Sequence, residues 1–360
     1  MSRDTGRPLP ISPMSSLPKL SYVLLSHNRE KYIRKALESA FAQDYEGELE
    51  YIISDDCSTD STLDIIRECV AAYKGKRRIV VTQPPRNMNL AGNTNHAVSF
   101  VESDWIIRAD DDDLSTIDRC TLIGRAIAEH PDCTYVVTGV DKFTDAEEQT
   151  ALHRSQTPCG ANVSTTRVDI REGFEAFRGH QPKIYSYKAW NMAVFRTFGP
   201  LDLDAYYIDD LTCYYRANML GSGLFLDNAI AVLARDGSGN MSRGGDDSTR
   251  HYKAILKREE FNDRYHNLSL RPLQETYQAM LDYVKAHLSD EEQKLIQPFL
   301  TDFQQELQTR ARICTYWRGS TLNRIRIARE LGYHGLFAWL RCLPLPLFAR
   351  LLALYRTLTR

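Results

Sequence analysis

Short apolar runs alternate with helical patterns along the first third of the chain. The runs are rich in β-branched residues and bounded by polar ones, which is typical of strands buried in a parallel sheet. We predict strands at residues 20–26, 49–54, 78–82 and 105–109. Between them apolar residues recur every three or four positions, which predicts helices at residues 33–41, 63–73 and 93–101. Right-handed crossovers then place the strands in one sheet with their carboxyl ends at one edge.

Carboxylates stand directly after two of these strands. Asp55 and Asp56 follow the second strand, and four consecutive acids, Asp110 to Asp113, follow the fourth. Unpaired carboxylates cannot stay inside a core, so they lie where side chains reach solvent or a ligand. Clustered carboxylate oxygens are the ligands that Mg²⁺ and Mn²⁺ prefer, whereas a solvated turn that caps the next helix is the alternative. We predict that the two clusters share one cleft.

The middle of the chain has a less regular pattern. A further strand is predicted at residues 133–144, and the polar, Thr-rich stretch at residues 147–168 predicts a mobile excursion. Residues 183–195 are rich in Tyr and Trp and predict an extended segment, followed by a turn at residues 196–202. Most of these aromatic side chains are expected in the core, although aromatic faces also pack on sugar rings. Residues 174–180 are candidates to line an acceptor site.

Helical periodicity dominates the last third of the chain. It predicts helices at residues 254–265, 273–288 and 291–313. Wound as a helix, residues 335–360 place leucines on one side and Arg350, Arg356 and Arg360 on the other, the composition of an in-plane membrane anchor. A helix docked on the protein's own domain is the alternative. No uncharged stretch there reaches the roughly 18 residues that span a bilayer.

Composition describes an ordinary globular protein of 360 residues, with 43% hydrophobic and 26% charged residues. The net charge is −2, but ten Arg, no Lys and one acid give residues 309–360 a charge of +9, which leaves −11 for the first 308 residues. The eight Cys form no C-x-x-C pair and predict reduced thiols in a cytosolic protein. Pro and Ser interrupt residues 1–19, which predicts a flexible leader rather than a signal peptide.

Two nucleotide-binding motifs are missing from the sequence. Neither G-x-G-x-x-G nor G-x-x-x-x-G-K-[ST] occurs, which argues against a dinucleotide dehydrogenase and a P-loop NTPase. Without a glycine-rich phosphate loop, a metal ion is the obvious counter-charge for a diphosphate. The arginine-rich tail has no recognised nucleic-acid-binding motif, so we predict no nucleic-acid partner.

Four motifs together resemble family 2 glycosyltransferases of the GT-A fold. They are the residues 26–30 (SHNRE), 53–62 (ISDDCSTDST), 87–97 (NMNLAGNTNHA) and 110–113 (DDDD), and they occur in the family's order within residues 20–245. The resemblance implies a nucleotide-diphospho-sugar transferase fold, a Rossmann-like mixed sheet flanked by helices, here with a C-terminal α-helical extension. Cys57, His27 and Asn89 stand at positions where the family usually has other residues.

The resemblance also implies roles for individual residues. Residues expected to bind the donor are Leu25, His27, Asn28, Asp55, Asp56, Asn95, Asp110 and Arg216. The divalent cation, Mn²⁺ or Mg²⁺, is expected on Asp112 as principal ligand, with Asp110 and Asp113. For Asp55 and Asp56 the alternative is a turn that caps the following helix.

The motif at residues 208–216 (IDDLTCYYR) resembles the element that carries the family's catalytic base. Asp210 matches the base, and Arg216, six residues later, matches the family's arginine. Such a base accepts a proton from the acceptor hydroxyl as this oxygen attacks the anomeric carbon opposite the leaving nucleoside diphosphate, and one displacement inverts the centre. The alternative is that acids here only favour a helix N-terminus, and both can hold.

These patterns predict four parts in the chain. They are a flexible leader at residues 1–19, a GT-A domain at residues 20–245, a helical extension at residues 246–334 and an amphipathic membrane-associating segment at residues 335–360. Within the domain, residues 20–115 form the nucleotide-binding half and residues 116–245 the acceptor half. The glycine-rich residues 233–242 are expected to act as a lid over the donor phosphates, and a plain exit loop is the alternative.

Taken together, the sequence predicts an inverting, metal-dependent glycosyltransferase. It would move a sugar from a nucleotide-diphosphate donor to a hydroxyl of a glycan or lipid-linked acceptor in surface polysaccharide synthesis, at the cytoplasmic, inner face of the plasma membrane, held to anionic lipid by its C-terminal segment. Two rival hypotheses are a non-catalytic, membrane-associated scaffold that binds nucleotide sugars and a metal-dependent nucleotidyltransferase.

Overall fold

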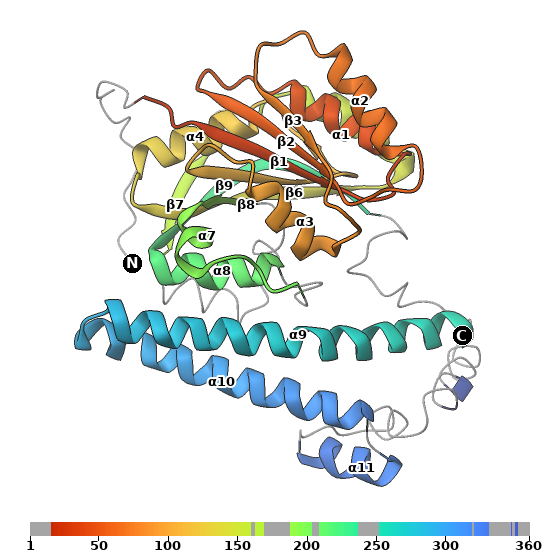
Figure 1. Cartoon of the computed structure of the whole chain (residues 1–360), viewed down its shortest axis with the longest axis vertical. Coiled ribbons are helices and arrows are strands. Elements are labelled where there is room, and N and C mark those ends of the chain that lie inside the picture. Colours follow the sequence, from red (N-terminus) through yellow and green to blue (C-terminus); the bar gives the residue numbers. More distant parts are fainter. Residues whose placement is uncertain are drawn as a thin grey trace.

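The computed structural model of the chain describes residues 16–159, 163–168, 188–203, 209–236, 252–318 and 320–330, together with residues 347, 350 and 351. In this part of the chain, a mixed sheet of nine strands lies between two layers of helices (Figure 1). The strand order is β3-β2-β1-β4-β8-β6-β9-β5, and β7 also pairs with β9.

The first half of the sheet is parallel, as predicted. Its strands are β1 (Leu20–Ser26), β2 (Leu49–Asp55), β3 (Ile79–Thr82) and β4 (Trp105–Asp110). The helices that connect them are α1 (Ile33–Phe41), α2 (Thr62–Ala72) and α3 (Asn89–Val98). Helix α3 begins four positions before the predicted start, because the polar residues of its first turn carry no apolar periodicity.

The second half of the sheet mixes parallel and antiparallel pairs. Its strands are β5 (Leu114–Ser115), β6 (Cys133–Phe143), β7 (Ser164–Val168), β8 (Lys188–Asn191) and β9 (Ser222–Arg235). Its helices are α4 (Arg119–Glu129), the short 3₁₀ helix η1 (Asp145–Glu147), α5 (Glu148–Ser155), α7 (Ala193–Phe198) and α8 (Asp209–Leu220). Strand β8 lies between β4 and β6 and runs antiparallel to both.

Three predictions for this half were wrong. The stretch predicted as a mobile excursion contains α5 and β7, which pairs with β9 over five residues. The segment predicted as extended ends after β8 and continues as α7. The start of the predicted lid, residues 233–235, belongs to β9. The rest of that lid and residues 174–180 lie outside the described residues.

Both faces of the parallel strands are buried. In β1, Leu20, Tyr22 and Leu24 belong to a core cluster with the apolar sides of α1 and α4, while Val23 and Leu25 point into the cluster shared with α3 and α8. Full burial of such a side chain stabilises the fold by about 1.5–3 kcal/mol. Two covered faces explain why these strands read as continuous apolar runs.

The C-terminal helices form one long hairpin and a shorter helix: α9 (Tyr252–His287), α10 (Asp290–Arg318) and α11 (Thr321–Glu330). The predicted break before residue 273 was wrong, because α9 continues through Pro272. Proline costs a helix one hydrogen bond and causes a steric clash. Buried Leu273 and Met280, on the following turns, supply packing that outweighs this cost.

Helix α10 packs against α8 and thereby joins the core of the sheet. The rings of Tyr215 in α8 and Phe303 in α10 stack with centroids 4.4 Å apart and an interplanar angle of 23°. Leu300, Phe303 and Leu307 belong to the same buried cluster as Trp190 in β8. Figure 1 shows α9 and α10 as two long helices on the α8 side of the sheet. The hairpin is therefore packed as part of the molecule's main core.

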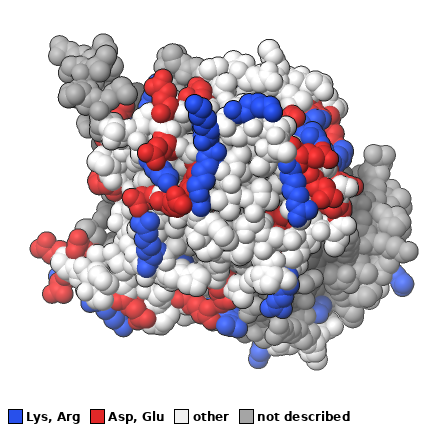
Figure 2. All heavy atoms as spheres, turned by 45° about the horizontal axis from the view of Figure 1, so that its top comes forward, with Lys and Arg blue, Asp and Glu red and all other residues white. Residues whose placement is uncertain are grey.

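On the surface, charges of both signs alternate. Figure 2 shows Lys and Arg side chains next to Asp and Glu on the face it displays. One exposed ion pair joins Arg34 and Glu68. None of the helices among the described residues combines the length and the apolar character needed to cross a bilayer. Of the predicted amphipathic segment only residues 347, 350 and 351 are described, and Leu347 is 45% exposed.

The packing of α10 against α8 leads to a stability prediction. Replacing Phe303, which is 3% exposed, by Ala should lower the free energy of unfolding by about 3–5 kcal/mol, because a buried ring is lost and a cavity remains. Leu322→Ala is the matched control: Leu322 is 80% exposed, so its change should stay within about 0.5 kcal/mol. Urea unfolding followed by circular dichroism measures both, and equal effects would contradict the shared core.

Candidate active site

The carboxyl ends of three parallel strands lie side by side. In the strand register, Leu25 of β1 pairs with Ser54 of β2 and with Asp110 of β4, and Ser26 pairs with Asp55. The two acidic clusters therefore flank the end of β1, as the strand pattern predicts. Leu25 itself is 4% exposed and packs in the core, so its main chain is the part that lies at this edge.

Asp55 is fully buried and stabilises the turn after β2. Its Oδ2 atom accepts hydrogen bonds from the Ser58 amide at 3.0 Å and from Gln83 Nε2 at 2.9 Å. Cys57, in the middle of this turn, has a φ of 56°, in the left-handed region that Gly and Asn adopt most easily. Asp55 thus has the turn-forming role that the sequence left as an alternative, and its part in donor binding stays a prediction.

Asp56 and His27 connect neighbouring strand ends. Asp56 Oδ1 accepts a hydrogen bond from the Met88 amide at 2.7 Å, and His27 Nδ1 lies 2.9 Å from the Asp56 carbonyl oxygen. Burial raises the pKa of Asp56, and the Met88 hydrogen bond opposes this increase. The His27 amide donates to Asp111 Oδ2 at 3.0 Å. His27 therefore contacts both acidic clusters.

Asn28 shapes the turn after β1. It has a φ of 54°, and its Oδ1 accepts a hydrogen bond from the Thr59 amide at 2.8 Å. Its own amide donates to Ser58 Oγ at 2.8 Å. Two predicted donor-binding residues, His27 and Asn28, thus hold the β1 and β2 turns together, which defines the shape of this edge.

Asp111 is a site residue that the sequence interpretation missed, because the family pattern treats it as variable. It is buried, and its Oδ1 lies 3.4 Å from Arg29 Nε. Burial and the charge of Asp112 raise the pKa of Asp111 to about 7, while Arg29 lowers it. Arg29 Nε also lies 3.7 Å from Asp112 Oδ2. Arg29 is therefore a counter-charge shared by two carboxylates.

The predicted set of three metal ligands is not gathered. Among the residues that the structure describes, no three His, Cys, Asp or Glu side chains form a group that could hold a metal ion. Asp113 Oδ1 accepts a hydrogen bond from the Arg235 amide at 2.8 Å and so connects to β9. Asp113 thus has a structural partner in β9, and its predicted part in metal binding stays a prediction.

Asp110 and Asp112 have the electrostatics expected of cation ligands. Burial raises the pKa of Asp110, Arg108 lowers it, and the charge of Asp210 raises it again. For Asp112, burial and then the charge of Asp110 raise the pKa. Mg²⁺ is commonly held by one or two carboxylates together with substrate phosphates and water. The pair therefore fits a divalent cation that also binds a diphosphate.

Asp210 lies beside Asp110 although the two are far apart in sequence. Helix α8 begins at Asp209, so Asp210 is in its first turn, where the helix dipole favours negative charge. Arg108 Nη1 donates to Asp210 Oδ1 at 2.5 Å, and Arg108 Nη2 lies 3.2 Å from Asp110 Oδ1. The predicted base and a predicted metal ligand thus contact the same guanidinium group. The sequence interpretation missed Arg108, although a charged residue inside the otherwise apolar β4 is a signal that could have identified it.

Asn95 and Arg216 have structural partners. Asn95 Nδ2 donates to the Leu201 carbonyl oxygen at 2.8 Å, and Asn95 Oδ1 accepts from the Leu201 amide at 2.8 Å. Arg216 donates to the carbonyl oxygen of Gly199 at 2.7 Å, and burial lowers its pKa. Both side chains hold the segment before α8, and their predicted part in donor binding stays a prediction.

Arg235 is a second buried arginine that the sequence interpretation missed. Its guanidinium lies 4.4 Å from the ring centroid of Tyr32 and 4.5 Å from that of Phe143. It also pairs with Asp145 at 2.6 Å and Glu148 at 2.7 Å. Together with the hydrogen bond from its amide to Asp113, these contacts fix the end of β9 beside the acidic run.

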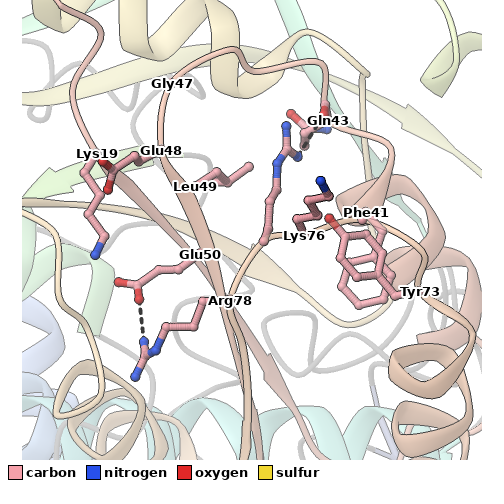
Figure 3. A pocket seen from close by; sticks show the side chains of 12 residues that line it. Lys19, Phe41, Gln43, Gly47, Glu48, Leu49, Glu50, Tyr73, Lys76 and Arg78 are labelled. Atoms are coloured by element: carbon pink, nitrogen blue, oxygen red, sulfur yellow. Dashed lines mark hydrogen bonds and ion pairs between the residues drawn. The ribbon is translucent and has the colours of Figure 1, made fainter.

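A cavity of about 700 Å³ lies at the opposite edge, where β1 and β2 begin (Figure 3). In Figure 3 the Glu50 and Arg78 side chains point toward one another and form an ion pair. Arg77 in the same wall donates to the carbonyl oxygens of Gln43 at 2.9 Å and Tyr45 at 2.8 Å. The charged groups of the cavity wall are thus largely engaged locally, and the predicted site residues lie at the other strand ends.

Comparisons with known proteins show what the chain is similar to. Residues 21–194 match the family "Glycosyl transferase family 2". EpsE of Bacillus subtilis, named as a glycosyltransferase, is 35% identical over 132 residues, which cover 37% of this chain and 46% of EpsE. The poly(ribitol-phosphate) beta-N-acetylglucosaminyltransferase TarS of Staphylococcus aureus is 35% identical over 97 residues, which cover 26% of this chain and 16% of TarS. The chain thus spans less than half the length of these relatives.

A solved structure with the same fold is that of S. aureus TarS residues 1–349 in complex with UDP-GlcNAc. It has a TM-score of 0.50 and 18% sequence identity, and the match covers 94% of this chain and 92% of that chain. The mixed sheet with acidic residues at the ends of its parallel strands is therefore a GT-A fold with a C-terminal helical extension. Over residues 21–194, slightly less than half of its 360 residues, the chain is similar to glycosyltransferase family 2.

The buried environment of Asp56 leads to a prediction of pH dependence. Because burial raises its pKa in the folded state, the folded protein binds this proton more tightly than the unfolded chain. Ionisation of Asp56 therefore opposes folding, and stability is lost as the pH rises through the folded pKa. Asp56→Asn can still accept from the Met88 amide and does not ionise. The Tm of Asp56→Asn minus that of the unaltered protein should increase with pH, and a decrease would contradict the assignment.

Proposed function

We propose that this chain is an inverting glycosyltransferase that moves a sugar from a nucleotide-diphosphate donor to a hydroxyl group of a glycan or glycolipid. The observation that carries the proposal is the contact of Asp110 and Asp210 with one guanidinium, that of Arg108. It brings the acid at the end of a nucleotide-binding strand next to a carboxylate at the start of α8. A donor held by the strand ends would then present its anomeric carbon to the acceptor beside Asp210.

The proposed chemistry needs a general base on the acceptor side. Asp210 accepts the proton of the acceptor hydroxyl while this oxygen bonds to the anomeric carbon and the bond to the diphosphate breaks. The attack comes from the face opposite the leaving group, so the configuration inverts. The side chain of Asp210 is 20% exposed, which allows contact with an acceptor.

Asp110 and Asp112 are the proposed ligands of a divalent cation, Mg²⁺ or Mn²⁺. Such a cation, when bound, would neutralise charge on the departing diphosphate. Desolvation is the main cause of the raised pKa of both carboxylates, and a neighbouring carboxylate raises each pKa further, so a nearby cation would stabilise their charged forms. Arg29 and Arg108 offset part of this charge in the protein itself.

The relatives support a role in building a surface polymer. TarS is named for the transfer of N-acetylglucosamine to poly(ribitol phosphate), and EpsE is also named as a glycosyltransferase. We therefore propose a glycan or lipid-linked glycan as the acceptor, and UDP sugars are the first donors to test. A scaffold that only binds nucleotide sugars would not release nucleoside diphosphate. A nucleotidyltransferase would release pyrophosphate instead.

Replacing Asp210 by Asn tests the proposal. Loss of a general base should lower the rate of sugar transfer by about 10²–10⁴-fold, because the acceptor proton then has no positioned acceptor. Nucleotide binding, measured as the rise of Tm with UDP or GDP, should change little. The rate is measured as release of nucleoside diphosphate with a radiolabelled donor.

Asp104→Asn is the matched control for this experiment. Asp104 is the same residue type, is 74% exposed and pairs with Arg196 away from the site. This variant should retain full transfer. Transfer that survives in Asp210→Asn would exclude Asp210 as the base, and release of pyrophosphate would favour the nucleotidyltransferase.

The C-terminal segment is proposed to hold the enzyme at the inner face of the plasma membrane. Residues 309–360 carry a charge of +9, and arginines near an anionic bilayer contribute about 1 kcal/mol each. Apolar residues on the other side of the predicted helix would enter the lipid interface. An acceptor linked to lipid would then be within reach of the site.

A liposome flotation assay tests this membrane proposal. The full chain should float with anionic liposomes, whereas the chain without residues 335–360 should stay at the bottom of the gradient. Replacing Arg350, Arg356 and Arg360 together by Gln keeps the apolar side and should weaken binding by about 100-fold, or roughly 3 kcal/mol. Unchanged flotation of the shortened chain would reject this segment as the anchor.

A further inference from the structure

Arg108 is a buried arginine in the middle of the candidate site. Its side chain is 7% exposed and lies between two carboxylates, Asp210 at 2.5 Å and Asp110 at 3.2 Å. The two contacts use different nitrogen atoms, Nη1 and Nη2. A planar guanidinium with two such contacts fixes the distance and the angle between its partners, which a point charge does not.

The alternation of β4 explains how Arg108 reaches α8. Successive strand residues point to opposite faces, so Ile106, Arg108 and Asp110 share one face. Ile106 belongs to the core cluster that contains residues of α8, and the same face therefore carries Arg108 toward the start of that helix. Burying a charge without partners is costly, so the two carboxylates are required for this placement.

Helix α8 is also held by contacts that do not involve Arg108. Tyr215 stacks on Phe303 of α10, and Arg216 donates to Gly199. The backbone position of Asp210 in the first turn therefore has support from the rest of the core. What Arg108 adds is the orientation of the Asp210 carboxylate, through a short bond to Oδ1.

We propose that Arg108 is the positioning residue of the catalytic base, and this inference rests on the function proposed above. Arg108 directs the Asp210 carboxylate toward the place where the acceptor hydroxyl meets the donor. Because the same guanidinium contacts Asp110, the orientation of the base is linked to the strand end that binds the donor. In this proposal Arg108 affects the reaction through the orientation of the Asp210 carboxylate.

The test is a double-mutant cycle between Arg108 and Asp210. Arg108→Met, which keeps the length of the side chain, should lower kcat by about 100-fold, because a base displaced by about 1 Å loses that much rate. In the Asp210→Asn background the same substitution should lower the remaining rate by less than about threefold, since the base that Arg108 positions is already lost. A residue with a merely structural role would reduce the rate equally in both backgrounds.

A second variant distinguishes loss of positioning from loss of the fold. Arg108→Lys keeps the charge but can contact only one carboxylate well, so it should lower kcat by about tenfold and restore part of the loss seen with Met. All variants are checked for an unchanged cooperative thermal transition. Arg196→Met is the control: it also removes an Arg–Asp ion pair of the β4 region, is 59% exposed and should leave kcat unchanged.

The outcomes separate this inference from the proposed function. Transfer retained in Asp210→Asn would exclude Asp210 as the base and with it the positioning role of Arg108, whereas release of pyrophosphate instead of nucleoside diphosphate would overturn the proposed function itself. If Asp210→Asn loses transfer and Arg108→Met lowers the rate by the same factor with Asp210 and with Asn at position 210, only the positioning role is overturned. An unchanged kcat in both Arg108→Met and Arg108→Lys would overturn it as well. The positioning role is supported if kcat falls strongly in Arg108→Met and less in Arg108→Lys. It also requires that Arg108→Met changes the remaining rate very little in the Asp210→Asn background.

Discussion

The candidate site depends on one constraint: carboxylates at the carboxyl edge of the sheet are removed from water and need nearby positive charge. Arginines supply it, among them Arg29 before α1, Arg108 in β4 and Arg235 at the end of β9. They come from elements far apart in the chain. An ion pair that joins two of these elements therefore also fixes how they meet. The positions of the arginines thus determine both the charge balance and the geometry of this edge.

The parallel half of the fold could be predicted because its signals are local. Strands such as Leu20–Ser26 are buried on both faces, so each one is a continuous apolar run that needs no knowledge of its partners. The other half depends on pairing across long distances. Strand β7 is polar and exposed along most of its length and is held by its ladder with β9, and Pro272 is kept in α9 by tertiary packing. Neither the pairing of β7 nor the packing around Pro272 produces a pattern of apolar and polar residues within the segment itself.

The difference between local and long-range signals also explains which parts of the candidate site could be predicted. The alternation of apolar runs and turns predicts that acids such as Asp56 and Asp110 lie at strand ends. It does not predict which residues form hydrogen bonds or ion pairs with them. Nothing near Asp210 in the sequence indicates Arg108, and only the tertiary structure connects them. Asn95 is a polar residue inside a motif for which the sequence did not indicate the structural partner: its amide is bonded to Leu201, and its part in donor binding stays a prediction. Motifs in the sequence identify which residue types are present. Long-range hydrogen bonds in the folded chain determine which partner each side chain has.

Stability alone does not account for charged pairs at this edge. Replacing a buried ion pair by apolar residues of similar volume is often neutral or stabilising, by about 1–4 kcal/mol. Interior strand positions such as Ile52 and Ile107 are apolar and fully buried. At the strand ends the chain instead keeps Asp110, Asp210 and Arg108 together. The reacting centre proposed above would require this, because apolar side chains of the same size provide neither the orientation nor the charge.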